Sequence, residues 1–221
     1  MSPSNPVMQY LVKKFVVGVF LACVVMWPEG GHTAETYAID PDHSSITFRI
    51  KHLGITFVYG MFPNAGGVYT FDDTTPENAS IWIKVKVADI NTGNQKRDRD
   101  LLGPDFFNEE KFPFIIFKSV SITASNDDRY RVTGELTLHG VTNKITVSAV
   151  KTGLYQDPSG ENRSGFETRF SVKRSDYGMK YMTAVADKVE LIVSVEGVRL
   201  EDAISPLDSN KILQEYGGVS W

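Results

Sequence analysis

The sequence has a single cysteine, Cys23, among its 221 residues. An intramolecular disulfide, a cysteine-rich zinc site and an iron–sulfur cluster are therefore excluded. An excess of positive charge is also missing, because 23 lysines and arginines stand against 27 aspartates and glutamates, for a formal charge of −4. This balance argues against a general nucleic-acid-binding or anionic-membrane-binding surface, although it leaves room for a local basic patch. Glycine and proline, at 18 and 10 residues, are near average and exclude a collagen-like or low-complexity chain.

A long apolar run is missing as well. The apolar segment 15–27 follows Lys13 and Lys14 and has 13 residues, which is too short to span about 30 Å of hydrocarbon but is typical of a signal-peptide core. We therefore predict a cleaved signal peptide over residues 1–34 and a periplasmic or secreted protein. An uncleaved anchor, a buried N-terminal strand and lipidation at Cys23 are the alternatives for this segment.

The rest of the chain alternates between apolar and polar residues with a period of two, which is typical of strands with one dry and one wet face. Six segments show the pattern clearly: residues 46–51, 81–87, 131–138, 144–149, 166–173 and 188–196. Residues 61–71 and 114–124 alternate less regularly, and Gly66-Gly67 in the first of them indicates a bulge or bend. Together these segments predict eight strands, mostly antiparallel because short turns join them.

One interval, residues 92–107, does not alternate. Thr92 with Gln95 three positions later has the pattern of a capping box, and Gly103-Pro104 is a stop signal. The pattern predicts one short helix over residues 95–102.

An even number of antiparallel strands with one apolar face must either close on itself or form a sandwich, and closure removes the exposed edges. Eight strands leave an interior that side chains fill or that holds one small ligand. We predict an all-β protein, an eight-stranded antiparallel barrel over residues 35–200 with one short helix near the lumen mouth and a C-terminal tail over residues 201–221.

The segments also match a known family in their order and spacing. The matching stretches include residues 39–44, 60–62, 90–94, 105–107, 112–113 and 134–142, with Phe48, His52, Arg97, Asp98 and Phe117 at single positions. On these residues the chain resembles the YceI-like family of exported, lipocalin-like, polyisoprenoid-binding proteins. Asn108, where the family often has Asp, and a longer tail are the departures.

The resemblance implies binding, storage or transport of a long-chain isoprenoid or similar amphiphilic lipid, such as a quinone tail, in the periplasm. It also implies, for some members, a membrane cytochrome b or quinone-pool component as partner. We predict no cofactor besides that lipid, no bound metal and no nucleic-acid partner. The apolar residues expected to bind the ligand are Ile46, Phe48, Ile50, Phe62, Ile83, Val85, Phe106, Phe107, Phe117, Leu136, Leu138, Val147, Phe166, Phe170, Leu191 and Val193. A polar lip is expected from His43, His52, Arg97 and Asp98.

Two other hypotheses remain open from the residues. The barrel interior could be a packed core without a lumen. Alternatively, His43, His52 and His139 could hold a metal ion for a hydrolase, although they share no local ligand spacing. The sequence has no nucleophile elbow, metal motif or phosphate loop, and Ser44 beside His43 is no evidence for a triad, because a triad is assembled across a fold. We therefore predict a binding protein and not an enzyme.

Overall fold

The computed structural model describes residues 34–202 except 127, 159 and 182. Nearly all of the predicted signal peptide and of the predicted C-terminal tail lies outside these residues. The described residues form one antiparallel sheet with the strands β1 (Glu35–Ile39), β2 (Ser45–His52), β3 (Thr56–Phe62), β4 (Ala65–Phe71), β5 (Ser80–Lys86), β6 (Phe114–Asn126), β7 (Arg129–Leu138), β8 (Val141–Gln156), β9 (Asn162–Lys173) and β10 (Val185–Arg199).

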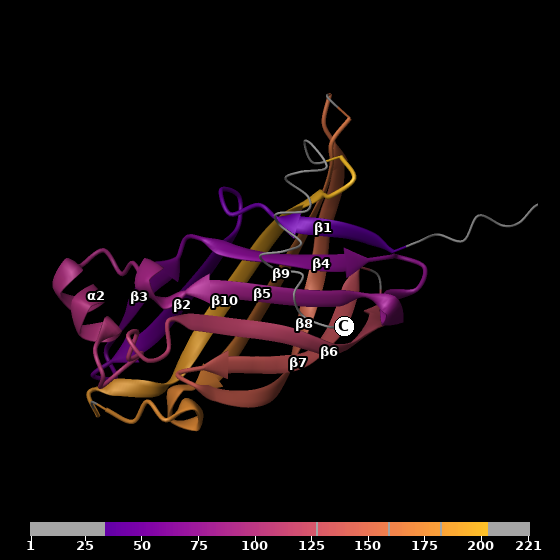
Figure 1. Ribbon diagram of the computed structural model, residues 1–221. Coiled ribbons are helices and arrows are strands. Elements are labelled where there is room, and N and C mark those ends of the chain that lie inside the picture. The colour runs from indigo at the N-terminus through magenta and orange to yellow at the C-terminus, as the bar shows by residue number, and fades with distance from the viewer. Residues whose placement is uncertain (1–33, 127, 159, 182, 203–221) are drawn as a thin grey trace, which may run out of the picture. The chain divides into compact units, whose positions relative to one another are not determined.

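The sheet closes into a barrel because β1 pairs with β4 on one edge and with β10 on the other. The closed ring runs β1-β4-β5-β6-β7-β8-β9-β10 and returns to β1. It has eight strands, as the alternating segments predict, and Figure 1 shows them surrounding a common interior.

Two positions in the ring are each shared by two consecutive strands. β1 and β2 both pair with β10, where Ile39 lies opposite Gly197 and Ser45 opposite Ser194. β3 and β4 lie alongside them in the same way, with β3 on β2 and β4 on β1. The ten strands therefore occupy eight strand positions around the barrel, because β1 shares one position with β2 and β3 shares another with β4. We call each of these eight positions a stave. The break between β3 and β4 falls at residues 63–64. Gly66 and Gly67, where the sequence predicts a bulge or bend, lie inside β4 and pair with β5 without a register shift, so they form no bulge; the φ of 155° at Gly67 is nevertheless a glycine conformation.

The strands β5 and β6 are joined by a long connection that carries the helix. This connection contains a short 3₁₀ turn, η2 (Val87–Asp89), and α2 (Gln95–Leu102), the single α-helix of the described residues. The bounds of α2 are those predicted, but its cap differs from the prediction: the Asn94 side chain accepts a hydrogen bond from the backbone N–H of Arg97 at 3.0 Å. Thr92 has another role, because its own N–H and hydroxyl donate to Asp98. Within the described residues, no helix has both the length and the apolar character needed to cross a membrane.

The connections fall at two ends of the barrel. The α2 connection, the β2–β3 hairpin, the β7–β8 turn and the β9–β10 connection, which begins with η3 (Arg174–Tyr177), lie at one end, which we call the α2 end. The β4–β5 connection with η1 (Pro76–Asn78) and the β6–β7 and β8–β9 turns lie at the other, which we call the far end.

Candidate functional site

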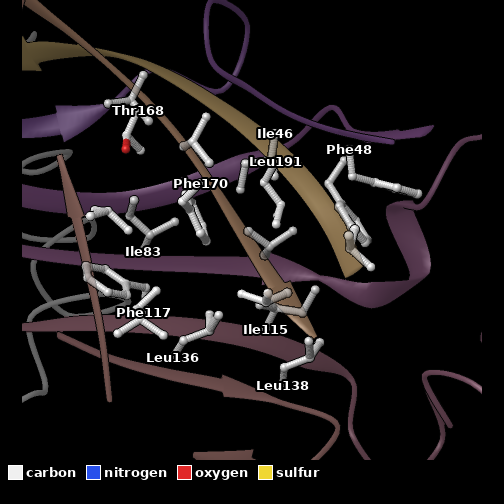
Figure 2. A pocket seen from close by; sticks show the side chains of 18 of the residues that line it. Ile46, Phe48, Ile83, Ile115, Phe117, Leu136, Leu138, Thr168, Phe170 and Leu191 are labelled. Carbon is white, nitrogen blue, oxygen red and sulfur yellow. The ribbon is translucent and has the colours of Figure 1, made fainter. Parts of the chain in front are cut away.

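The barrel interior holds a cavity of about 620 Å³ that the staves surround. Its size is within the range of about 300–1,000 Å³ that is usual for small-molecule sites. Figure 2 shows side chains from several strands pointing into the space, among them Ile83 of β5, Phe117 of β6, Leu136 of β7 and Leu191 of β10. Because successive residues of a strand point to opposite faces, closure turns each apolar face inward.

All sixteen apolar residues that the sequence singles out line this cavity. They are Ile46, Phe48, Ile50, Phe62, Ile83, Val85, Phe106, Phe107, Phe117, Leu136, Leu138, Val147, Phe166, Phe170, Leu191 and Val193. The lumen is therefore a real space and not a core filled by side chains alone.

Further apolar residues of the lining were not singled out. Ile81, Val132, Ile145, Val172 and Val195 belong to the same alternating faces. The period-two rule already placed them on the dry face, so the same signal would have found them. The lining from the less regular strand β6 was harder to assign, because that strand begins with apolar residues on both faces.

Aromatic rings pack together at the far end. The Tyr37 and Tyr69 rings stack with centroids 5.1 Å apart, and Phe71 contacts Tyr130 at 5.1 Å and Phe166 at 5.0 Å, both edge-on. Tyr37, Tyr69, Phe71 and Tyr130 are buried. These rings form the floor of the lumen, which the sequence analysis did not identify because the tyrosines come from three separate strands.

Polar groups on the inner wall are already engaged with the protein. The Tyr69 hydroxyl donates to the Ser164 carbonyl at 3.1 Å and contacts the Ser164 hydroxyl at 2.6 Å, and burial raises the pKa of Tyr69, so its hydroxyl stays protonated. Thr168, whose oxygen is visible in Figure 2, donates to the Ser148 carbonyl at 2.9 Å. These hydroxyls therefore need no hydrogen-bond partner from a ligand.

Most of the other polar lining comes from the α2 end, apart from Thr70 on β4 and Glu167 on β9. Lys96 and Asp100 on α2, Asn94 at its cap and His52 at the end of β2 all contribute to the cavity wall. Lys96, Asp100 and Asn94 are exposed, so the cavity reaches solvent here. This end is the mouth of the lumen.

Arg97 and Asp98 have different positions at the mouth. Arg97 lines the cavity and is fixed by bonds from its guanidinium to the Thr92 hydroxyl at 2.8 Å and to the Thr92 carbonyl at 2.7 Å. Asp98 accepts from the N–H and hydroxyl of Thr92 and is not part of the lining. Asp98 thus holds the loop that positions Arg97, because its carboxylate is directed at the helix approach and not at the lumen.

His43, expected at the lip, lies elsewhere. It belongs to the loop 40–44 between β1 and β2, which both run along β10, so this loop lies partway along the barrel wall and not at the mouth. Its Nδ1 is 2.8 Å from a carboxylate oxygen of Asp40, and this hydrogen bond raises the pKa of His43. Arg163 bonds the same Asp40 at 2.9 Å and also contacts Glu196.

The three histidines of the hydrolase alternative occupy three separate parts of the fold. His52 ends β2, His43 lies in the loop 40–44, and His139 in the β7–β8 turn has its Nδ1 3.0 Å from the Tyr177 carbonyl. The described residues do place ligand atoms of Asp40, His43 and Glu196 within 4.8 Å of one another. Arg163 already pairs with both carboxylates and with Glu161, however, so part of the negative charge that would attract a cation is already neutralised.

A buried cation at the mouth was missed by the sequence analysis. The Arg174 guanidinium donates to the carbonyls of Met179, Tyr181, Val185 and Ala186, at 2.5–3.1 Å. These bonds fix the segment that leads from η3 into β10 and so shape one side of the mouth. No local sequence pattern predicts this role of Arg174, because only the fold brings these carbonyls close to its guanidinium.

Comparison with known proteins agrees with this architecture. A family model described as the YceI-like domain matches residues 37–197. The protein YceI of Escherichia coli is 36% identical over 191 residues, covering 85% of this chain and 99% of that protein.

Solved structures have the same fold. The YCEI protein of Campylobacter jejuni is similar with a TM-score of 0.62 and 30% identity, over 67% of this chain and 89% of that one. A structure titled as a polyisoprenoid-binding domain from Saccharophagus degradans has a TM-score of 0.60 at 13% identity, over 76% of this chain and 99% of that one. The match over residues 37–197 and the identity to the Escherichia coli protein show that this chain belongs to the YceI-like family.

Proposed function

We propose that the protein binds, stores or transports a long-chain isoprenoid or a similar amphiphilic lipid. The observation that carries the proposal is the continuous apolar lumen, which runs from the aromatic floor at Phe71, Tyr130 and Phe166 to the polar mouth at α2. A long apolar tail fits the lumen and a polar headgroup fits the mouth, so the cavity has the polarity of an amphiphile.

The energetics favour such a ligand. Withdrawing apolar surface from water contributes about 25 cal/mol per Å², and the lumen offers apolar side chains on every stave. A flexible tail loses conformational freedom on binding, but several hundred Å² of buried tail surface outweighs that loss. The inner hydroxyls of Tyr69 and Thr168 are bonded to the protein, so an apolar tail leaves no inner polar group newly unpaired.

At the mouth, the proposed headgroup contacts are Arg97, Lys96, Asn94 and His52. Arg97 and Lys96 are cations, and Asp100 on the same wall is a carboxylate that accepts a bond from Lys96 at 2.9 Å. The N–H groups of Arg97, Lys96 and Asn94 favour a headgroup with oxygen acceptors, such as a quinone or a phosphorylated isoprenoid. The Saccharophagus degradans structure, titled as polyisoprenoid-binding, supports the isoprenoid class for the tail. We further propose a binding role without catalysis, in the periplasm, with a membrane cytochrome b or another quinone-pool component as partner.

Organic extraction of purified protein followed by mass spectrometry of the extract tests the proposal. We expect a stoichiometric lipid with an isoprenoid tail, and reloading of the stripped protein by an isoprenoid quinone but not by its tail-less headgroup. Equal binding of the headgroup alone, or a protein that carries a stoichiometric transition metal and accepts no lipid, would contradict a lumen carrier. The second result would favour the metal-dependent hydrolase.

A further inference from the structure

The β2–β3 hairpin at the mouth carries apolar side chains that the protein does not bury. Leu53 is 60% exposed, Ile55 81%, Phe57 36% and Tyr59 56%; we call these four residues the rim patch. Scattered exposed apolar residues are ordinary, but a contiguous set on one hairpin marks an interaction site.

The backbone of this hairpin is held in place. The Leu53 N–H donates to the Ala184 carbonyl at 2.8 Å, which ties the hairpin to the β9–β10 connection. Leu53 and Gly54 both have left-handed φ angles, 51° and 73°, and a left-handed conformation is uncommon for leucine. The turn thus displays a large apolar side chain in a position where asparagine or glycine would fit more easily.

The rim patch lies at the mouth of the lumen. His52, the residue before Leu53, lines the cavity. In the neighbouring β9–β10 connection, Tyr181 is 49% exposed and packs edge-on against Phe106, another lining residue, with centroids 5.5 Å apart. Exposed apolar groups therefore border the opening through which a lipid tail enters.

The outer face of the sheet beside the patch is basic. Lys51 lies opposite Phe57 on β2 and β3, Arg49 lies opposite Tyr59, and Lys173 lies opposite Lys188 on β9 and β10. Glu190, the carboxylate that the pairing places among them, is bonded to Arg49 at 2.8 Å. Asp187, exposed next to Lys188 and interacting electrostatically with Lys173, is a second carboxylate. Four cations therefore stand against two carboxylates, in contrast with the formal charge of −4 of the whole chain.

We propose that the rim patch and these four cations form a docking surface for an anionic lipid bilayer. The apolar tip enters the interface between headgroups and acyl chains, while Arg49, Lys51, Lys173 and Lys188 face anionic headgroups. Apolar insertion combined with electrostatic attraction is the usual basis of reversible membrane binding. The purpose of the contact rests on the proposed function: it brings the mouth to the membrane from which a lipid is collected or to which it is delivered.

The shape of the surface favours a membrane over a second protein. A stable protein interface uses about 20–30 residues on each side, whereas a hairpin tip offers a few. The segment after α2 also limits the orientation, because its Asp105, Glu109 and Glu110 outnumber its one cation, Lys111, and repel an anionic surface. The docked barrel therefore tilts toward its hairpin side.

Vesicle flotation tests the proposal. We compare the protein expressed from the full sequence with its Leu53→Asn/Ile55→Ser variant, on vesicles of phosphatidylcholine with 30% phosphatidylglycerol and on pure phosphatidylcholine. Two apolar side chains withdrawn from water correspond to a loss of about tenfold or more in the partition coefficient. Asparagine accepts the left-handed conformation at position 53, so the fold is expected to be unchanged.

The matched control is Leu154→Asn/Tyr155→Ser. These residues are 58% and 60% exposed and lie at the end of β8 near the far end, so this variant should float like the wild type. The apolar run at residues 15–27 is common to all variants, so it cannot cause a difference between them.

The charge contribution is measured separately. Neutralising Lys51, Lys173 and Lys188 to glutamine should weaken binding to the anionic vesicles by about fivefold per cation at low salt, with little change on pure phosphatidylcholine. Flotation of the Leu53/Ile55 variant equal to that of the wild type would overturn the proposal. So would a wild-type dimer that this variant converts to a monomer without any change in flotation, since the patch would then be a self-association surface.

Loading of a detergent-dispersed fluorescent isoprenoid, measured without vesicles, separates the two proposals. The rim variants should load normally, because their substitutions lie outside the lumen. If the wild type floats with anionic vesicles but loads no isoprenoid, the lumen function fails while the docking surface stands.

Discussion

Replacing Leu136 by arginine distinguishes an open lumen from a packed core. Leu136 lies on β7, is 8% exposed, and packs beside Leu138 in the lining of the cavity. Its partner across the strand pair is Phe117. Leu138 ends β7 at the mouth, so position 136 lies two residues, or about 7 Å along the strand, from that end. An arginine side chain is long enough to extend toward the mouth and keep its charge hydrated.

The loss of stability in the Leu136→Arg variant depends on whether the arginine charge stays hydrated. In the open lumen the variant loses the burial of one leucine, about 1.5–3 kcal/mol, which lowers the melting temperature by roughly 3–12 °C for a domain of this size. In a packed core the unpaired charge adds several kcal/mol. The sum would then approach the whole stability of a domain, about 5–15 kcal/mol, and the folded protein would be lost.

Thermal unfolding and lipid occupancy are measured together. We expect Leu136→Arg to remain folded while the amount of co-purifying or reloaded lipid falls severalfold. Val120→Arg is the control, because Val120 is an exposed residue of the neighbouring strand β6, and both properties should then be unchanged. An unfolded Leu136 variant would refute the open lumen, and a folded variant with full lipid occupancy would refute contact between Leu136 and the ligand.

Three further predictions concern stability. Hydrogen bonds, first from the Thr74 hydroxyl, hold the pKa of Asp72 at about 2, below its unfolded value of about 3.9. Its contribution is therefore complete above about pH 4 and is lost as the pH falls through about 2, and Asp72→Asn should lower the melting temperature at pH 6 more than at pH 2. Gly67→Ala should destabilise by about 1–3 kcal/mol, because a Cβ would lie 2.1 Å from the Trp82 carbonyl oxygen, whereas Gly153→Ala, which meets nothing within 4 Å, should not. A chelator should leave the melting temperature unchanged, and a drop of more than a few degrees would support a structural metal.

Alternation predicted most of the lumen because a strand's side chains follow its backbone geometry. Once Ile83 and Leu136 lie on the dry faces of antiparallel strands and the sheet closes, they have no other direction to point. The helix bounds were predictable for a similar reason, since the Gly103-Pro104 stop is local. The capping-box pattern predicted Thr92 as the cap, whereas the structure has Asn94, whose side chain accepts from the Arg97 N–H, a contact that the pattern does not specify.

The remaining features depend on contacts between distant segments. His43 follows a turn-like sequence, which resembles the end of a strand, but β1 and β2 continue along the same partner and place it on the barrel wall. The floor tyrosines and the carbonyl bonds of Arg174 join residues from separate elements. No single-sequence pattern contains that information.

The double pairing of β10 has a consequence for how the protein is made. β10 is the last strand of the described chain, and its two edges hold β9 on one side and both β1 and β2 on the other. β1, the first strand of the described chain, can pair with β10 only after nearly all of the described residues have left the ribosome, and this distant pairing slows folding. If the chain is exported as proposed and meets the translocation machinery before β10 has been synthesised, it has no lumen at that point and cannot carry lipid out of the cytoplasm. Its first ligand is then a lipid that it binds after export and folding, on the periplasmic side of the membrane.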